Sequence, residues 1–192
     1  ETLISHGAKT NIQDKNRTSL LHYACAGGSV EIVARITKDP GQASLKNGSK
    51  ETPMHFAART GCIDVVKYLL EIGAANDEPD ISGKTPLMLA SAQGEKSIVE
   101  MLVNAGANIR RLDSSGNNAI HHAVIGSADH ETVRLLVDLG ALVNVANRSK
   151  ETPAHLSVRK KSLAILEVLL EAGASVRTVS YTHLTLPTNR EV

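Results

Sequence analysis

The sequence is poor in aromatic residues and in excess charge of either sign. Aromatic residues make up 2% of the 192 residues, with no Trp and a single Phe, so aliphatic side chains must fill the core. The net charge is +1, which argues against general nucleic-acid binding, because such binding needs a basic stripe or an aromatic stacking platform. No apolar run approaches the length of a membrane span.

Cysteine is also scarce. Cys25 and Cys62 are too few for a disulfide framework or a zinc quartet. This usage favours a reducing compartment, and we expect an intracellular, cytoplasmic protein. The chain begins with Glu1 rather than Met, so the lack of a signal peptide says little, and we interpret the chain as a fragment.

A repeat of about 33 residues organises the sequence. Aligned positions recur with spacings of 33, 33, 33 and 34 residues, at Ser19, Thr52, Thr85, Asn118 and Thr152. An Asp or Asn precedes each of these positions by five residues. We predict an array over residues 1–178, comprising a half unit (1–13) and five units (14–46, 47–79, 80–112, 113–146 and 147–178). The near-copies SKETPMH (49–55) and SKETPAH (149–155) occupy the same slot of two units.

Each unit predicts two short helices and a loop. Thr52 can cap the first helix, Pro53 suits its first turn, and Gly61 can end it in the left-handed conformation. The second helix, CIDVVKYLLEI, has apolar residues at helical spacing, at Val65, Val66, Leu69 and Leu70. The polar segment 74–84 contains Pro and Gly and predicts a loop or hairpin. One such helix pair cannot bury its apolar face alone, so neighbouring units must stack.

The frame D-x-x-G-x-T-P-L-x-x-A, followed by G, I-V and L-V-x-x-G-A over Asp80–Ala107, resembles the ankyrin repeat. The resemblance recurs in five units and implies an all-α solenoid of helix-turn-helix units joined by hairpin-like loops. It also implies structural roles for Thr52, Thr85 and Thr152 as helix caps. The histidines of one slot would bond the capping hydroxyl and the loop backbone, tying one unit to the next; they are His22, His55, His121 and His155.

No constellation of residues predicts catalysis or metal binding. His122 and His130 fall outside the histidine slot and lack a Cys or acidic partner at ligand spacing, so we predict surface positions for both. The segment 83–85 resembles the end of a phosphate-binding loop, but Glu78 stands where that motif needs Gly. We therefore expect no catalytic, cofactor-binding or metal-binding residues, and no enzyme activity.

A binding surface is the remaining expectation. The resemblance implies a concave face built from loop tips and the outward side of the first helices. The candidate residues are Glu51, Arg59, Thr60, Ile81, Ser82, Lys84, Gln93, Asn117, Ile125, Arg148, Glu151, Arg159 and Lys160. Ile81 and Ile125 are the candidate apolar anchors. The cations Arg148, Arg159, Lys160 and Lys161 suggest an acidic partner segment, although a solvated charged face is the alternative.

We therefore expect a monomeric, non-catalytic protein-interaction scaffold without nucleic-acid or membrane binding in this chain. The alternative is a regulatory or substrate-recruiting region of a larger protein, such as an ion channel, a ubiquitin ligase or a kinase. After Thr178 the repeat register fails. VSYTHLTLPT looks like a translated sequencing adapter, so we interpret residues 179–192 as an assembly artefact, with a natural extended tail as the alternative.

Overall fold

The computed structural model describes residues 12–37, 41–126 and 128–175. The expectations for the leading half unit up to residue 11 and for the tail 179–192 lie outside these residues. Within the described ranges the chain forms α-helices, one short 3-10 helix and no strand. The elements are α2 (Leu20–Gly27), α3 (Val30–Ile36), η1 (Gln42–Ser44), α4 (Pro53–Thr60), α5 (Ile63–Glu71), α6 (Pro86–Gln93), α7 (Lys96–Asn104), α8 (Ala119–Ile125), α9 (His130–Asp138), α10 (Pro153–Arg159) and α11 (Leu163–Glu171).

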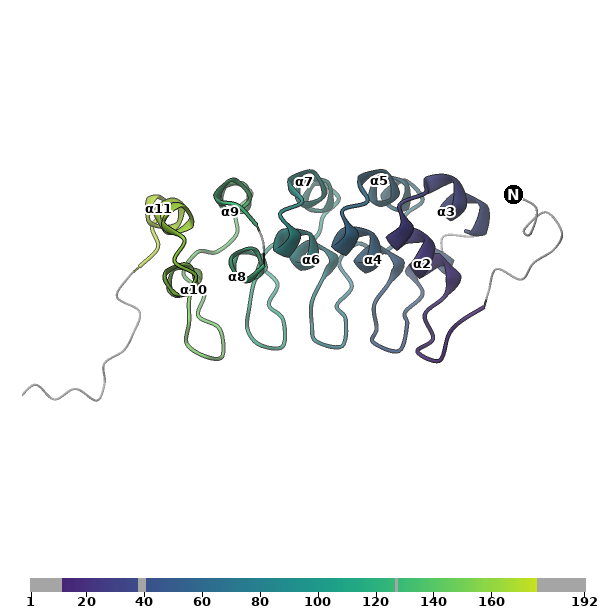
Figure 1. The fold of residues 1–192 in the computed structure, drawn as a ribbon, viewed down its shortest axis with the longest axis horizontal. Coiled ribbons are helices and arrows are strands. Elements are labelled where there is room, and N and C mark those ends of the chain that lie inside the picture. The colour runs from purple at the N-terminus through teal and green to yellow at the C-terminus, as the bar shows by residue number, and fades with distance from the viewer. Residues whose placement is uncertain (1–11, 38–40, 127, 176–192) are drawn as a thin grey trace, which may run out of the picture.

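The helices stack in two parallel rows (Figure 1). The first helices of the pairs, α2, α4, α6, α8 and α10, pack side by side in chain order. The second helices, α3, α5, α7, α9 and α11, form the other row, and long loops project on the side of the first helices (Figure 1). Each helix pair packs on its neighbours along the chain, as in a solenoid. The predicted all-α solenoid is confirmed.

Local signals set the start and end of the first helices. In α4, the Thr52 side chain accepts from the third helical N–H, and the His55 ring accepts from the Thr52 N–H, which forms a capping box. Pro53 occupies the first turn, where its missing N–H is not needed. Gly61 ends the helix with φ of 72°, a left-handed value that glycine adopts without a Cβ clash.

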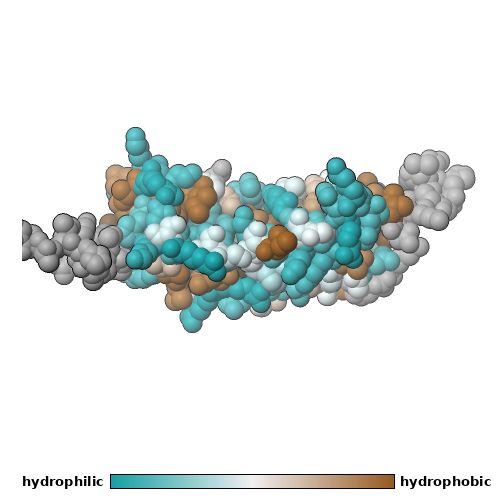
Figure 2. Space-filling model, turned by 90° about the horizontal axis from the view of Figure 1, so that it is seen from below, coloured by the Kyte–Doolittle hydropathy of each residue, from teal (hydrophilic) through white to brown (hydrophobic). Residues whose placement is uncertain are grey.

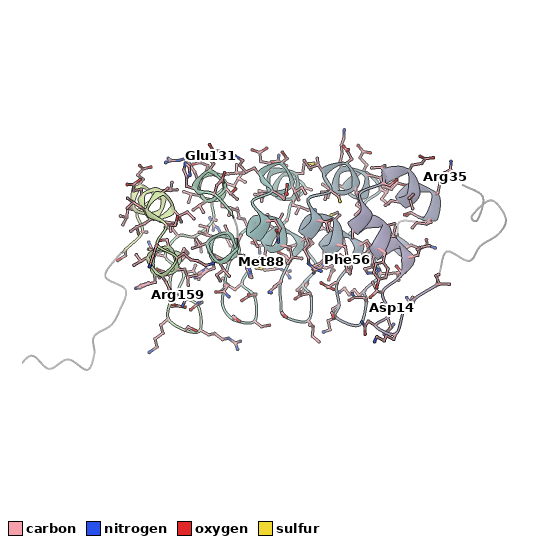
Figure 3. The ribbon with its side chains drawn as sticks, viewed as in Figure 1. Asp14, Arg35, Phe56, Met88, Glu131 and Arg159 are labelled. Atoms are coloured by element: carbon pink, nitrogen blue, oxygen red, sulfur yellow. The ribbon has the colours of Figure 1, made fainter. Side chains whose placement is uncertain are left out.

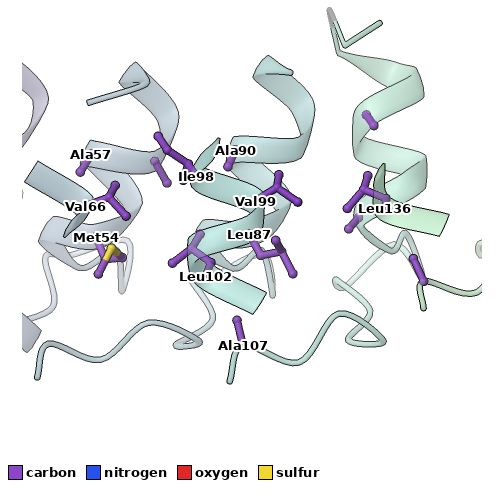
Figure 4. Close-up of a cluster of buried hydrophobic side chains, with 14 of the residues drawn as sticks. Met54, Ala57, Val66, Leu87, Ala90, Ile98, Val99, Leu102, Ala107 and Leu136 are labelled. Carbon is purple, nitrogen blue, oxygen red and sulfur yellow. The ribbon is translucent and has the colours of Figure 1, made fainter. Parts of the chain in front are cut away.

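The core lies between the two rows and is aliphatic (Figure 4). Val65, Val66 and Leu69 of α5 are fully buried, and Leu70 packs against the core while partly exposed. Ala57 and Ala90 hold equivalent positions on adjacent first helices and are also fully buried. Small residues at these contacts let the helices approach closely, which explains how the chain builds a core with so few aromatic rings.

Each loop tip is closed by an Asp or Asn side chain. Asp80 Oδ1 accepts from the backbone N–H groups of Ser82 and Lys84, both at 2.8 Å. The Asp80 N–H in turn donates to the Lys84 carbonyl at 2.8 Å. The same side-chain pattern recurs at Asp14, Asn47, Asp113 and Asn147. A short side chain with a carbonyl or carboxylate oxygen is needed to form this turn, which explains the Asp or Asn in every unit.

Backbone hydrogen bonds also join each tip to the next. The Ile81 N–H donates to the Ser49 carbonyl, and the Ser114 N–H donates to the Ser82 carbonyl, both at 2.8 Å. Equivalent bonds run from Arg148 to Ser115 at 2.8 Å and from Gly48 to Asn16 at 2.6 Å. Backbone hydrogen bonds therefore join the tips of the described units into one continuous row.

Candidate protein-binding surface

The loop tips and the outward side of the first helices form one face, which we call the tip surface. Ile81 is 66% exposed there, and Ile125 is 41% exposed. Polar and charged candidates also reach solvent on it, namely Thr60, Ser82, Gln93, Arg148, Arg159 and Lys160. Figure 2 views the loop-tip side and shows hydrophilic atoms over most of it, with small separate hydrophobic patches.

Other candidates are partly or wholly withdrawn from solvent. Lys84, Arg59, Glu51 and Glu151 are half-buried. Asn117 is only 8% exposed. It donates to Asp113 Oδ2 at 3.3 Å and accepts from the Asn147 side chain at 3.0 Å. The Asn117 side chain therefore joins two loop tips and is not presented on the tip surface.

An acid and a base form the same ion pair in the two SKETP units. Glu51 pairs with Arg59, and Glu151 pairs with Arg159. Burial opposes ionisation of Glu51, but hydrogen bonds from Arg59 and Asn47 outweigh it and lower its pKa. Both arginines are thus neutralised locally by a carboxylate of their own unit.

The remaining members of the predicted basic group differ from one another. Lys160 Nζ donates to the Ile125 carbonyl at 2.9 Å, which ties the lysine to the preceding unit. Arg148 and Lys161 are exposed, and neither has an ion-pair partner within the described residues. The four cations therefore do not form one uniform patch.

The histidine slot forms a ladder along the stack. The Nε2 atoms of His22, His55 and His121 lie 3.0, 3.1 and 3.2 Å from loop carbonyls of the next unit. His155 lies against the Thr152 hydroxyl at 2.8 Å. Burial lowers the pKa of His22, His55 and His121, so these rings are neutral at pH 7. Met88 holds the slot in the unit that lacks a histidine.

The prediction that His122 lies on the surface is wrong. The residue is 7% exposed, and its Nε2 lies 2.9 Å from Asp113 Oδ2. Burial lowers the pKa of His122, and the hydrogen bond and charge of Asp113 partly offset this effect. From the neighbouring loop, the charge of Lys84 lowers the pKa and that of Asp80 raises it. Tyr23 makes the equivalent contact to Asp14 at 2.9 Å, so this position faces the loop aspartate of its own unit. His130 is exposed, as predicted.

Two aromatic residues on the tip surface were missed as candidates. Tyr23 is 54% exposed, and its ring lies edge-on to Phe56 with centroids 6.5 Å apart. The Arg59 guanidinium lies 5.4 Å from the Phe56 centroid, a cation–π contact. Both aromatic residues follow the capping residue by four positions, so the repeat register could have shown that they lie side by side.

The described residues hold no cluster of three His, Cys, Asp or Glu side chains that could bind a metal ion. No helix in the described ranges is long and apolar enough to span a membrane. A shallow hollow lies between α10 and α11, and its lining is mainly apolar: Ala154, His155, Val158, Leu166 and Ser175. His155 in this lining is bonded to the Thr152 hydroxyl of its own helix cap.

Comparison with known proteins agrees with the fold. The family model described as "Ankyrin repeats (3 copies)" matches residues 1–80, 37–113 and 87–180. The chain is 41% identical over 61 residues to human Ankyrin repeat and SOCS box protein 16, covering 32% of this chain and 14% of that protein. It is 42% identical over 72 residues to mouse Rabankyrin-5, covering 36% of this chain and 6% of that protein. The matched segments span only a small part of these relatives. With family matches along most of its length, the chain belongs to the ankyrin-repeat family.

Proposed function

We propose that this array is a non-catalytic protein-interaction module that binds its partner through the tip surface. Ankyrin repeats indicate protein–protein interaction, and the location of the binding site on the tip surface is our addition. The observation that carries it is the row of loop tips joined by backbone hydrogen bonds, from which Ile81 protrudes into solvent. Such a row is ordered before a partner arrives, so binding loses little conformational entropy.

The exposed apolar side chains of the tip surface support this proposal. Ile81, Tyr23 and Ile125 come from three different units and are 66%, 54% and 41% exposed. Interfaces in which a few apolar or aromatic anchors lie within a polar surround are common, and these anchors carry most of the binding energy. The second-helix row also has exposed apolar residues, namely Ile32, Ile63, Leu163 and Leu170. Among the described residues, the loops after the second helices are joined through side chains, such as Asn76 to the Ala105 carbonyl, whereas the loop tips are joined by a run of backbone hydrogen bonds.

The regulatory or recruiting role within an ion channel, ubiquitin ligase or kinase stays a prediction. The intracellular location and the monomeric state are likewise predictions. The ankyrin-repeat fold typically serves as a non-enzymatic scaffold, which supports the non-catalytic assignment.

The test compares two matched variants in capture of partners from a cell extract. Ile81→Ser removes an anchor of the tip surface, whereas Ile63→Ser removes an isoleucine of α5 that is 43% exposed on the other row. We expect a partner that the wild type and Ile63→Ser capture equally, and that Ile81→Ser captures about tenfold less well. Loss of capture only in Ile63→Ser, or equal capture by all three proteins, would contradict the proposal.

A further inference from the structure

The near-neutral chain separates its charge between the two sides of the stack. Five exposed cations stand at the loop tips, and we call them the tip cations: Lys15, Arg17, Lys50, Arg148 and Lys150. None of them has an ion-pair partner in the part of the chain that the structure describes. The loop carboxylates near them are already engaged, because Asp14 accepts hydrogen bonds and Glu51 and Glu151 pair with arginines.

The second-helix row has the opposite character. Its acidic residues outnumber its basic ones and include Asp64, Glu71, Glu100, Glu131, Asp138, Glu167 and Glu171. The bases Lys96 and Arg134 are paired there with Glu131 and Glu171. Figure 3 shows Glu131 on the second-helix side and Arg159 on the tip side. Such a separated distribution steers and orients an approaching charged partner even though the net charge is small.

Three of the tip cations occupy a strained backbone position. Arg17, Lys50 and Lys150 have φ of 59°, 60° and 60°, in the left-handed region that disfavours residues with a Cβ. The equivalent residues of the two intervening units are Gly83 and Gly116, with φ of 79° and 78°. Glycine therefore fits this turn, and the chain places a long cation there at some cost in stability. Strain of this kind, kept at a surface tip, points to binding.

The tips between these cations present no exposed charged side chain, because Asp80 and Lys84 are half-buried and Asp113 is buried. Ile81 and Ser82 form one tip, and Ser114 and Ser115 form the next. The first two tips and the last tip of the row therefore carry exposed cations, whereas the two tips between them do not. Neighbouring units are spaced by about 8–10 Å, the usual distance between packed helices, so the row spans about 32–40 Å. An extended peptide of about 10–12 residues covers that distance.

We propose that the tip cations bind an extended acidic segment of a protein partner, with acidic residues toward both ends and an apolar residue at Ile81. This inference rests on the proposed function and names the chemistry of the partner. A nucleic acid fits less well, because its evenly spaced phosphates favour a continuous basic stripe and bases that can stack. An anionic membrane surface favours a compact polybasic cluster, whereas these cations lie in two groups separated by neutral tips.

The test uses a fluorescein-labelled peptide of about twelve residues, with Asp and Glu at both ends and Leu in the centre. The test variant is Lys50→Gly/Lys150→Gly, which removes two tip cations and installs the glycine of the intervening units. The control is Lys67→Ala/Arg110→Ala, which removes two exposed cations away from the tips. We expect the wild type and the control to bind the peptide in low salt, and the glycine variant to bind about fivefold more weakly. Its melting temperature should be equal or higher, which excludes unfolding as the cause.

The other outcomes overturn the inference. Equal weakening in both variants would show a response to net charge alone, and no peptide binding by the wild type would exclude an acidic segment. Stronger tip-dependent binding to a single-stranded oligonucleotide or to phosphatidylserine vesicles would assign the tips to nucleic acid or membrane. Dimerisation that the glycine variant abolishes would assign them to the acidic row of a second copy. A partner that still depends on Ile81 but is insensitive to Lys50→Gly/Lys150→Gly would leave the proposed function standing and this inference refuted.

Discussion

His55 Nε2 lies 3.1 Å from the carbonyl oxygen of Lys84 in the next unit. On the other side of the ring, Nδ1 accepts from the Thr52 N–H at 3.0 Å. Because Nδ1 accepts, the proton must sit on Nε2, which donates to the Lys84 carbonyl. One neutral ring thus completes the capping box of its own helix and joins two units.

Exchange of residues in the histidine slot tests this double role. His55→Met, which places the Met88 residue type in the slot, should lower the free energy of unfolding by about 1–3 kcal/mol through the lost hydrogen bonds. The converse change Met88→His should raise it by about 1 kcal/mol, because the Asn117 carbonyl follows in the same loop position as the Lys84 carbonyl. Urea unfolding followed by circular dichroism measures both. Equal effects of His55→Met and of His130→Ala, at an exposed position, would refute the role.

Stability should fall in mild acid. Burial lowers the pKa of His22, His55, His121 and His122 below the ordinary value of 6.5. Below pH 6.5 the unfolded chain therefore takes up protons that the folded chain does not, so folding weakens as the pH falls. Each histidine contributes at most about 1.4 kcal/mol per pH unit.

Urea unfolding should be measured at about pH 7.5 and about pH 5.5. Both pH values lie above the ordinary pKa values of carboxyl groups, so the change in the unfolding midpoint reports mainly the histidines. His122→Leu, with the residue type of Leu89 and Leu156 at the equivalent positions, should show a smaller fall than the wild type. A stability that does not change between the two pH values would contradict this prediction.

Relief of backbone strain at a loop tip should increase stability. Lys50→Gly should raise the free energy of unfolding by about 0.5–1 kcal/mol, since glycine removes the left-handed penalty at φ of 60°. The expected rise is smaller than the full penalty because glycine also gains freedom in the unfolded chain. Lys67→Ala, on an ordinary helical backbone, is the control for loss of the charge. A loss of stability in Lys50→Gly would mean that the lysine side chain contributes more than its backbone strain costs.

Gly126 should not tolerate a side chain. A Cβ there would overlap the backbone oxygen of Ala92 in the preceding unit, and neither backbone can move aside cheaply. We expect Gly126→Ala to cost about 2–3 kcal/mol. Gly27→Ala is the matched control, because a Cβ at Gly27 meets no atom within 4 Å, and it should be neutral or stabilising. Thermal unfolding of the two variants measures the difference.

The two cysteines should differ in reactivity. Cys25 is fully buried, and burial raises the pKa of its thiol to about 12, with a smaller contribution from Cys62. Since the thiolate is the reactive form, iodoacetamide near pH 8 should modify half-buried Cys62 and leave Cys25 intact until the protein unfolds. Peptide mass spectrometry identifies the modified residue. Modification of Cys25 at the same rate in folded protein would contradict its burial.

The fold was predictable because its signals are local. Thr52 and Pro53 begin a helix, Gly61 ends it, and the spacing of Val65, Val66 and Leu69 marks its partner's buried face. The candidate surface was predictable only in part. The register placed Ile81 and Ile125 on exposed positions, but it could not reveal that Asn117 is held between Asp113 and Asn147. That burial depends on side chains from two loops.

The contact of His122 with Asp113 was also not predictable from the sequence. The sequence shows no acidic residue at ligand spacing from His122. Asp113, nine residues earlier, nevertheless contacts it, because the loop folds back against the first helix. Chain reversal creates this contact, and a linear pattern does not display it. Tyr23 and Asp14 show that the relation recurs, so the structure of one unit predicts the contact in another.

By itself, the sequence determined the repeat period, the helix boundaries and the aliphatic core, because caps, glycines and apolar spacing act over a few residues. It also determined which residue types stand at the loop tips. Only the tertiary structure decided which of their charges are paired within the described residues. Glu51 and Glu151 neutralise Arg59 and Arg159, whereas Lys50 and Lys150 have no such partner among the described residues. The physical reason is that ion pairing depends on distances between side chains, and these are set only when the loop folds back against its helix and the units stack.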